Sequence, residues 1–326
     1  MSRFEPAEEG TFTQSIDLRA FLLVSLKHGV LNLLTLTLHR FWGQAQVRRW
    51  IWGAVDIEDE PLDYVGGGLE LLLGFLLRVV VIGGPVLIAW FAVKAWGVWG
   101  APLVLTAWAL AAFFQGMGRF AGFLYMASHT EWRGQNFQLE GSPVPFALRH
   151  LRDAGLCVIT LGWWQPRAHL RQARRLWGAL NFHGRPFYFD TAAARRTRAH
   201  PAYAIGWFGT VMIVLFAAGI LLGLAAGFFP TPDVGSAPTL SQLAALFALT
   251  VGLWVLLNVI WAPYQAERRR GVALGLGLSL DIDWREMARL NAMNALLRFA
   301  SLGVLAPFVQ ARTSAFLVDR LKGRMI

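Results

Sequence analysis

Four long runs of apolar residues dominate the pattern of the chain. These runs are residues 79–93, 101–118, 202–229 and 240–262, and none of them holds a charged side chain. A helix needs about 20 apolar residues to cross a hydrocarbon core of about 30 Å. Because the runs come in two close pairs, they predict two transmembrane helical hairpins, over residues 79–118 and 202–262.

Three shorter apolar segments alternate with basic stretches. They are Leu33–Phe41, Leu156–Gln165 and Ala300–Phe308. About a dozen residues cannot cross a bilayer as a helix, so these segments are expected either to re-enter the membrane or to lie flat in its interface. For the first segment a third interpretation is open, in which residues 16–38 form a spanning helix. That helix would place Lys27 and His28 near the membrane centre, where charge is costly.

The short segments belong to a pattern that repeats along the chain. A shift of 125 positions places the Thr-Leu pair of residues 35–36 on residues 160–161, and the Trp-Gly-Ala of residues 52–54 on residues 177–179. Residues 301–307 resemble the same pattern. Such self-similarity is the mark of duplicated structural units. We predict a first unit over residues 1–152, a second over residues 153–290 and a truncated third over residues 291–326.

Short strand-like stretches follow the basic segments and the long runs. They are residues 54–64, 130–139, 179–190 and 276–284. Apolar and polar residues alternate there, as expected of short strands or hairpins. The predicted fold is an all-α integral membrane protein with two transmembrane hairpins, repeated short re-entrant or interfacial segments and small cytoplasmic β-like excursions.

Basic residues are concentrated outside the long apolar runs. The chain carries 30 Lys and Arg residues against 20 Asp and Glu, a net charge of +10. Loops rich in Lys and Arg stay in the cytoplasm. We therefore expect a multi-pass protein of the bacterial cytoplasmic (inner) membrane, with both hairpin tips outside and the C-terminus inside. The first ten residues are acidic and lack the pattern of a cleavable signal peptide, so none is expected.

Composition narrows the partners of this chain. Hydrophobic residues make up 56% of its 326 positions and charged residues only 15%, whereas a soluble domain is nearer a quarter charged. In so apolar a chain the basic loops are expected to bind anionic lipid head groups rather than nucleic acid. The single cysteine, Cys157, excludes an intramolecular disulfide and is expected to be a small buried apolar side chain.

Two groups of side chains are the candidate sites. Contacts with anionic lipid or another anion are expected from Arg48, Arg49, Arg167, Arg171, Arg174, Arg175, Arg268 and Arg312. Polar groups at membrane depth are expected at Lys27, His28, Gln115, Asn258 and Arg298. Gln115 and Asn258 lie well inside long apolar runs, so each is expected to seek a hydrogen-bond partner across the helix bundle.

The sequence carries no catalytic or cofactor motif. It has no HExxH pair, no G-x-S-x-G elbow and no Walker A loop. Two acid–base candidates, His129 with Glu131 and His150 with Asp153, are expected to be interfacial ion pairs. We therefore predict neither an enzyme activity nor a metal or other cofactor.

Two motifs resemble a known family. Residues 159–166, Ile-Thr-Leu-Gly-Trp-Trp-Gln-Pro, with Arg171 after them, resemble the Leu-Thr-Leu-Gly and Pro-Trp stretch of the YjgN family of bacterial inner-membrane proteins. Residues 130–137 resemble that family's Thr-x-Trp-Arg-Gly-x-x-Phe motif. The first repeat departs from the pattern, because Thr37 replaces the glycine and no proline follows Trp42. The resemblance covers most of the chain and implies membrane location and repeat architecture, but no activity.

Two classes of function remain open. Internal repeats and broken apolar segments favour a transporter- or channel-like protein for an anionic or amphiphilic solute. The alternative is a non-enzymatic structural, assembly or accessory subunit that binds anionic lipid and a protein partner through its cytoplasmic side. A stripe of glycines at residues 219, 223 and 227 is compatible with a homo-oligomer or with packing inside one chain.

Overall fold

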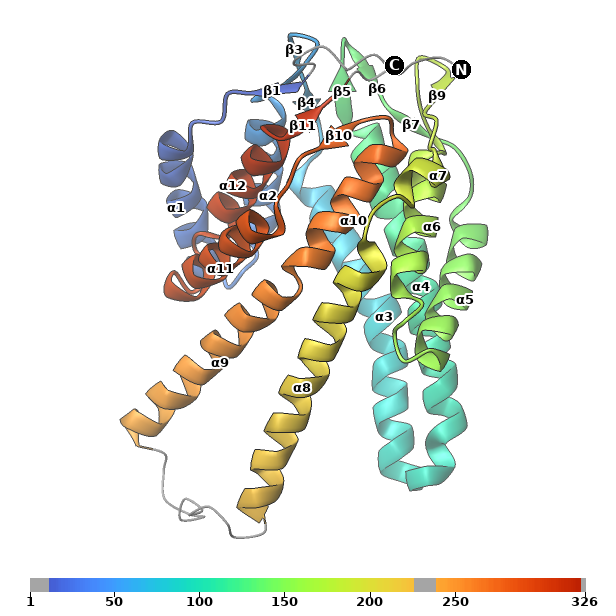
Figure 1. Cartoon of the computed structure of the whole chain (residues 1–326), viewed down its shortest axis with the longest axis vertical. Helices are drawn as coiled ribbons and strands as arrows, with labels where there is room; N and C mark the ends of the chain where they lie inside the picture. The colour runs from blue at the N-terminus through green and yellow to red at the C-terminus, as the bar shows by residue number, and fades with distance from the viewer. Residues whose placement is uncertain (1–11, 226–238, 324–326) are drawn as a thin grey trace.

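The computed structural model describes residues 12–225 and 239–323, and helices dominate it (Figure 1). Residues 226–238, at the end of the third long apolar run and before the fourth, lie outside the described residues, as do the first eleven residues and the last three, which include the C-terminus. Within the described ranges the helices differ widely in length, and small sheets join them. Helices therefore position the candidate sites.

Three helical stretches are long and apolar enough to cross a membrane: Gly68–Ser128, Ala199–Gly219 and Leu243–Ile260. They comprise α3 (Gly68–Trp96), the 3-10 turn η1 (Gly97–Gly100), α4 (Ala101–Ser128), α8 (Ala199–Ala225) and α9 (Leu240–Ile260). Apolar side chains along these helices, such as Val80 and Phe216, remain exposed on the protein surface. A helix with apolar residues all round needs an apolar environment. The prediction of long apolar helices is confirmed.

The long helices extend beyond the apolar runs that predicted them. α3 begins at Gly68 and α4 ends at Ser128, whereas the runs covered residues 79–118. The two helices lie side by side on either side of η1. Their added turns carry polar side chains such as Glu70, which continue each helix beyond its apolar length.

Three helix–turn–helix segments have matching lengths. They are α1 (Leu18–Leu34) with α2 (Arg40–Trp52), α5 (Pro143–Ile159) with α6 (Gln165–Trp177), and α11 (Trp284–Ala300) with α12 (Ala306–Val318). In each segment a helix of 17 residues precedes a helix of 13 residues. The three short apolar segments of the sequence contain the turns between these helices and the adjoining helix ends. Residues 16–38 are thus a shorter helix and a turn, rather than one long helix.

The three turns share one backbone conformation. The second turn residue is a leucine with positive φ: Leu36 (48°), Leu161 (50°) and Leu302 (49°). The third is Thr37 (72°), Gly162 (93°) or Gly303 (86°). A hydroxyl at the first turn position (Thr35, Thr160 or Ser301) donates to the preceding helix and accepts an amide of the next, at 2.7–3.1 Å. One side chain therefore caps two helices.

The prolines of the repeated pattern begin helices instead of ending them. Pro166 lies in the first turn of α6 and Pro307 in the first turn of α12. A proline fits there because the first turn leaves its backbone N–H groups without partners anyway. The chain reverses direction just before each of them.

Four small sheets lie at the end of the molecule opposite the turn between α3 and α4 (Figure 1). Their strands are β1 (Phe12–Gln14), β2 (Val55–Ile57), β3 (Glu60–Pro61), β4 (Asp63–Tyr64), β5 (Thr130–Trp132), β6 (Gln135–Asn136), β7 (Gln138–Leu139), β8 (Leu180–Phe182), β9 (Arg185–Pro186), β10 (Ser279–Leu280) and β11 (Leu321–Lys322). All pairings are antiparallel. The small β-like excursions are confirmed in all four predicted stretches.

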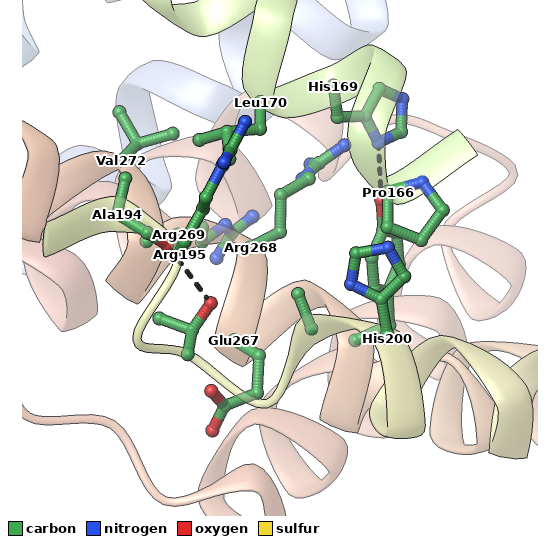
Figure 2. Close-up of a pocket in the computed structure, with 14 residues that line it drawn as sticks. Pro166, His169, Leu170, Ala194, Arg195, His200, Glu267, Arg268, Arg269 and Val272 are labelled. Carbon is green, nitrogen blue, oxygen red and sulfur yellow. Dashed lines mark hydrogen bonds between the residues drawn. The ribbon is translucent and has the colours of Figure 1, made fainter. Parts of the chain in front are cut away.

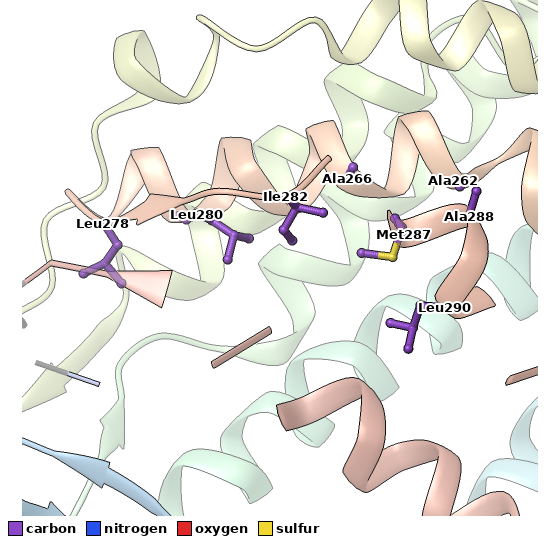
Figure 3. Packing of buried hydrophobic residues seen from close by; sticks show 9 residues of the cluster. Ala262, Ala266, Leu278, Leu280, Ile282, Met287, Ala288 and Leu290 are labelled. Atoms are coloured by element: carbon purple, nitrogen blue, oxygen red, sulfur yellow. The ribbon is translucent and has the colours of Figure 1, made fainter. Parts of the chain in front are cut away.

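The largest buried apolar cluster surrounds α10 (Ala262–Gly275), which follows α9 after Trp261. Ala262 and Ala266 are fully buried and leave space for Met287 of α11. Figure 3 shows these residues with Ile282, which the β10 loop places in the same cluster. Small residues allow helix backbones to approach closely. The cluster packs α10 against α11 and β10, and α10 also lies beside α6, α8 and the short helix α7 (Thr191–Ala194).

Candidate functional site

A cavity of about 390 Å³ opens between α6, the α7–α8 connection and α10. α6 contributes Pro166 and His169, the connection contributes Arg195, and α10 contributes Tyr264 and Arg268. Figure 2 shows the His169 and His200 rings on one side of this cavity, with Arg268 facing them and Arg195 beyond it. Because these residues come from three separate parts of the chain, only the fold brings them together.

A chain of hydrogen bonds sets the orientation of the cavity's tyrosine. The Cys157 thiol donates to Oε1 of Gln165 (3.1 Å), and Nε2 of Gln165 donates to Nε2 of His169 (2.9 Å). The hydrogen of His169 is therefore on Nδ1, which donates to the Tyr264 hydroxyl oxygen at 2.5 Å. The Tyr264 O–H hydrogen then remains available to an acceptor in the cavity.

The same chain keeps this side of the cavity neutral. Burial, followed by the charges of Arg268 and Arg119, lowers the pKa of His169 to about 4. Burial also raises the pKa of Tyr264 well above its usual value. At neutral pH His169 is therefore uncharged and Tyr264 keeps its proton. Cys157 is half-buried and hydrogen-bonded, so it is more than the small apolar side chain that its surroundings predicted.

Arginines give the cavity an excess of positive charge. Arg195 and Arg268 have no acidic side chain as an ion-pair partner within residues 12–225 and 239–323. Glu267 also lines the cavity, but it pairs with Arg270 (2.6 Å) and accepts the amide of Arg198 (2.8 Å). The one carboxylate that lines the cavity is thus already engaged, which leaves the two arginines for an anion.

A cluster of aromatic side chains lies directly beside the cavity. Tyr203 of α8 packs with Tyr264 and Trp261 at ring distances of 5.1 and 5.2 Å, and Trp163 packs with Trp207 at 5.3 Å. Trp207 also donates to the carbonyl of Leu161 in the turn before α6 (2.8 Å). The cavity therefore joins a basic region to an aromatic surface at the start of an apolar helix.

A buried carboxylate lies in the neighbouring α5–α6 segment. Asp153 is 1% exposed and accepts from Arg152 (3.3 Å), Arg171 (3.4 Å) and Arg175 (3.3 Å). The indole N–H of Trp164 also donates to Asp153, at 3.4 Å. Several donors around one carboxylate compensate for its removal from water. Asp153 therefore fixes where these arginines lie.

The expected acid–base pairs are wrong. His150 contacts Gln115 of α4 (3.1 Å) and Gln172 of α6 (3.0 Å), not Asp153. Burial and the nearby Arg119 lower the pKa of His150 to about 4, so it links these helices as a neutral group. The same holds for the other pair, because the imidazole of His129 lies 3.2 Å from Glu70 instead of Glu131.

The predicted polar residues at membrane depth have different surroundings. Gln115 has the partner across the bundle that its position predicted, through His150. The Asn258 side chain instead donates to the carbonyl of Trp254 in its own helix (2.8 Å). His28 is buried and lies 3.0 Å from His39, whereas Lys27 and Arg298 are exposed.

The predicted anion-contacting arginines divide into separate groups. Arg268 lines the cavity beside α6, whereas Arg171, Arg174 and Arg175 line a second cavity between α5 and α6. The others contact protein groups: Arg48 and Arg49 bond to Tyr64, Arg167 stacks on Trp164, and Arg312 donates to Asn294. The sequence thus identified arginines of both cavities without showing that they belong to two sites.

Sequence reasoning missed His169, Tyr264 and Arg195 in the first cavity. The contact between His169 and Tyr264 joins residues 95 positions apart, and no local pattern indicates it. Gln165 and His169 are one helical turn apart, which was the only local signal. No group of three or more His, Cys, Asp or Glu side chains in the described part of the chain is arranged to hold a metal ion.

Comparisons with known proteins agree with the family resemblance. Neither the curated proteins nor the solved structures contain a match to this chain. A family model described as "Bacterial protein of unknown function (DUF898)" matches residues 15–325, which is nearly the whole chain, and the resemblance to the YjgN family is confirmed. The chain therefore belongs to this bacterial family, and its long apolar helices are compatible with a membrane protein.

Proposed function

We propose that this protein binds an anionic amphiphile in the cavity between α6, α8 and α10 and acts as a transporter- or channel-like protein, without catalysis. The observation that carries the proposal is the direct contact between the basic cavity and the aromatic cluster of α8. An amphiphile needs both surfaces: arginines and a tyrosine hydroxyl for its charged head, and aromatic rings for its apolar part.

The proposed membrane arrangement has two hairpins, α3 with α4 and α8 with α9, crossing the bacterial cytoplasmic membrane. The sheets and the arginine-rich helices then lie in the cytoplasm, because basic loops are retained there. The turn between α3 and α4 faces the opposite side. Cysteine labelling checks this: a cysteine at Gly97 should react from outside and one at Arg196 only from inside. The reverse pattern would contradict the arrangement.

The three helix–turn–helix turns are proposed to enter the membrane from its cytoplasmic side. Leu36, Leu161 and Leu302 at these turns are 86%, 74% and 77% exposed. Figure 1 shows the turns directed toward the same end of the molecule as the turn between α3 and α4. Exposed leucines at the tip of each turn suit contact with lipid chains. The cavity would then lie at the membrane interface, where amphiphiles are located.

Movement of an anionic lipid across vesicles is the test of this function. Purified protein is reconstituted into phosphatidylcholine vesicles that contain a fluorescent phosphatidylglycerol, and dithionite reports the label that reaches the outer leaflet. We expect faster exchange with wild type than with R195Q/R268Q, by at least about ten-fold, because the loss of even one charge-assisted bond of about 1.5 kcal/mol corresponds to that factor.

The matched control is R185Q/R196Q, which removes two exposed arginines that line neither cavity. It should exchange lipid as fast as wild type. Exchange that is no faster with wild type than in protein-free vesicles would contradict transport. Equal rates for wild type and R195Q/R268Q would contradict the role of the cavity.

An accessory role is the alternative that one observation favours. α8 and α9 diverge toward their far ends (Figure 1), and large apolar side chains such as Phe216 and Phe247 remain exposed on them. These surfaces suit a helix of a partner protein as well as lipid. Retention of an anionic lipid without any exchange, together with a protein that co-purifies in mild detergent, would favour this role over transport.

A further inference from the structure

A second cavity, of about 650 Å³, lies between the first half of α5 and the second half of α6. Four arginines line it: Arg149, Arg171, Arg174 and Arg175. Ser142, at the start of α5, also lines it, and its hydroxyl does not cap the helix. This cavity shares no lining residue with the cavity of the proposed function. It therefore requires an explanation of its own.

The charges in this cavity are only partly compensated. Arg171 and Arg175 pair with the buried Asp153. Arg149 and Arg174 have no ion pair or side-chain hydrogen bond with any residue of the described ranges. Glu140 is the one carboxylate that lines the cavity, and it accepts from the Asn181 amide (2.7 Å). Two arginines thus face the cavity without a partner, next to two whose positions Asp153 fixes.

The positive charges repel one another at this site. Burial lowers the pKa of the Arg175 guanidinium, and the nearby Arg149 and Arg152 lower it further. Asp153 opposes this effect but is shared among three arginines. An anion held between Arg149 and Arg174 would relieve the repulsion. The arrangement thus favours a ligand with more than one negative charge or with several acceptor oxygens.

We propose that this cavity binds a phosphate group through Arg149 and Arg174, with Arg171, Arg175 and the Ser142 hydroxyl as further donors. Guanidinium groups match phosphate because their paired N–H donors bond to two oxygens at once. The aromatic cluster that accompanies the first cavity is absent from the lining of this one, which is mainly polar. Its ligand is therefore recognised by the phosphate itself, whether as a soluble phosphate or as the head group of a phospholipid.

The test separates these two sources of phosphate. In one arm, protein in phosphatidylcholine nanodiscs is titrated with inorganic phosphate or pyrophosphate, with chloride at equal ionic strength as the reference. In the other arm, nanodiscs contain phosphatidylglycerol, and lipid retention is read by native mass spectrometry. The variant R149Q/R174Q removes only the two unpartnered arginines and leaves every donor to Asp153 in place. R185Q/R196Q is the control with the same change in charge.

We expect R149Q/R174Q to bind at least about ten-fold more weakly than both wild type and the control. A loss seen with inorganic phosphate assigns the cavity to a soluble phosphate compound, and a loss seen only with phosphatidylglycerol assigns it to a lipid head group. Equal affinity of R149Q/R174Q and the control in both arms would overturn the proposal. R195Q/R268Q should behave like wild type when inorganic phosphate is added, which separates this site from the first cavity.

Discussion

The first and second helix–turn–helix segments have the same helix lengths and the same turn, but they bury different polar residues between their helices. Position by position they lie 125 residues apart, and both have helices of 17 and 13 residues joined by the same turn. In α1–α2 the buried centre is His28, which lies 3.0 Å from His39. In α5–α6 the equivalent position holds Asp153, surrounded by three arginines.

The third segment shows which contact of the buried polar residue recurs in another segment. Asn294 occupies the position equivalent to Asp153, and Arg312 contacts it at 3.4 Å, the same distance as between Arg171 and Asp153. The turn therefore sets how the two helices of a segment are arranged. The residue at this buried position decides how many arginines gather around it. Only the segment with a carboxylate there gathers the arginines that line the second cavity.

The largest effect is expected from neutralising the carboxylate. D153N leaves three arginines around a neutral amide and should reduce the free energy of unfolding by about 3 kcal/mol, because breaking a buried ion pair leaves charge uncompensated. H28N, at the equivalent position of α1–α2, should cost less than half as much. The midpoint of thermal unfolding in detergent measures both. Equal losses would show that the two centres do not differ in the way described.

The next effect is a pH dependence of stability that arises in the second segment, from His169. His169 of α6 has its pKa lowered to about 4 by burial and by the charges of Arg268 and Arg119, with His150 contributing. The unfolded chain therefore binds more protons between pH 6.5 and 4, and stability should fall as pH falls through this range. At pH 5 the loss from this group is about 2 kcal/mol.

H169Q keeps a polar side chain that does not titrate, so it should remove about 2 kcal/mol of the stability loss between pH 7 and 5 and leave the part that comes from His150. Thermal unfolding of wild type and H169Q at both pH values measures the difference. H183Q is the control, because His183 is exposed on the turn between β8 and β9. If H169Q loses as much stability on acidification as wild type, His169 is not the buried neutral group described above.

A smaller effect tests whether the three turns are equivalent. T35V, T160V and S301A each remove the hydroxyl that joins two helices, and each should cost about 1 kcal/mol. The three variants should lose similar amounts of unfolding free energy, because the same hydrogen bonds are present in all three turns. A large loss at one site with none at the others would show that the turns differ in spite of their shared geometry.

The smallest effect concerns the third turn residue. Thr37 has a positive φ, which glycine adopts without strain, so T37G should stabilise the protein by about 0.5–1 kcal/mol. G303A should cost a similar amount, since its added methyl group meets open space and only the backbone is strained. Chemical denaturation of both variants checks the signs. A destabilised T37G would mean that the Thr37 side chain makes a contribution of its own.

The sequence predicted the features that depend on neighbouring residues. Long apolar runs gave the long helices, and alternation gave the small sheets, because both patterns follow from local periodicity. The predicted ends of the long helices were less accurate, because polar side chains such as Glu70 continue these helices beyond their apolar length. The origin of the three segments as an internal repeat stays a prediction, even though their helix lengths agree.

The candidate site was predicted only in part. Arg268 was identified from charge, but its cavity needs His169 from α6 and Arg195 from before α8, and distant packing decides which of these meet. Asp153 was named in the sequence as a partner of His150, but its ion pairs are with Arg152, Arg171 and Arg175. The shift of 125 positions places it on His28, and two buried ionisable residues at equivalent positions would have indicated a centre shared by both segments.

The most direct test of the central claim is to measure which lipids stay bound to the purified protein. Native mass spectrometry of wild type, R195Q/R268Q and R185Q/R196Q, each extracted from the same membrane in mild detergent, makes this comparison. The account predicts that wild type and R185Q/R196Q retain an anionic lipid in preference to zwitterionic lipids, and that this preference is reduced in R195Q/R268Q. An unchanged ratio of anionic to zwitterionic lipid on R195Q/R268Q would contradict the assignment of the cavity between α6, α8 and α10.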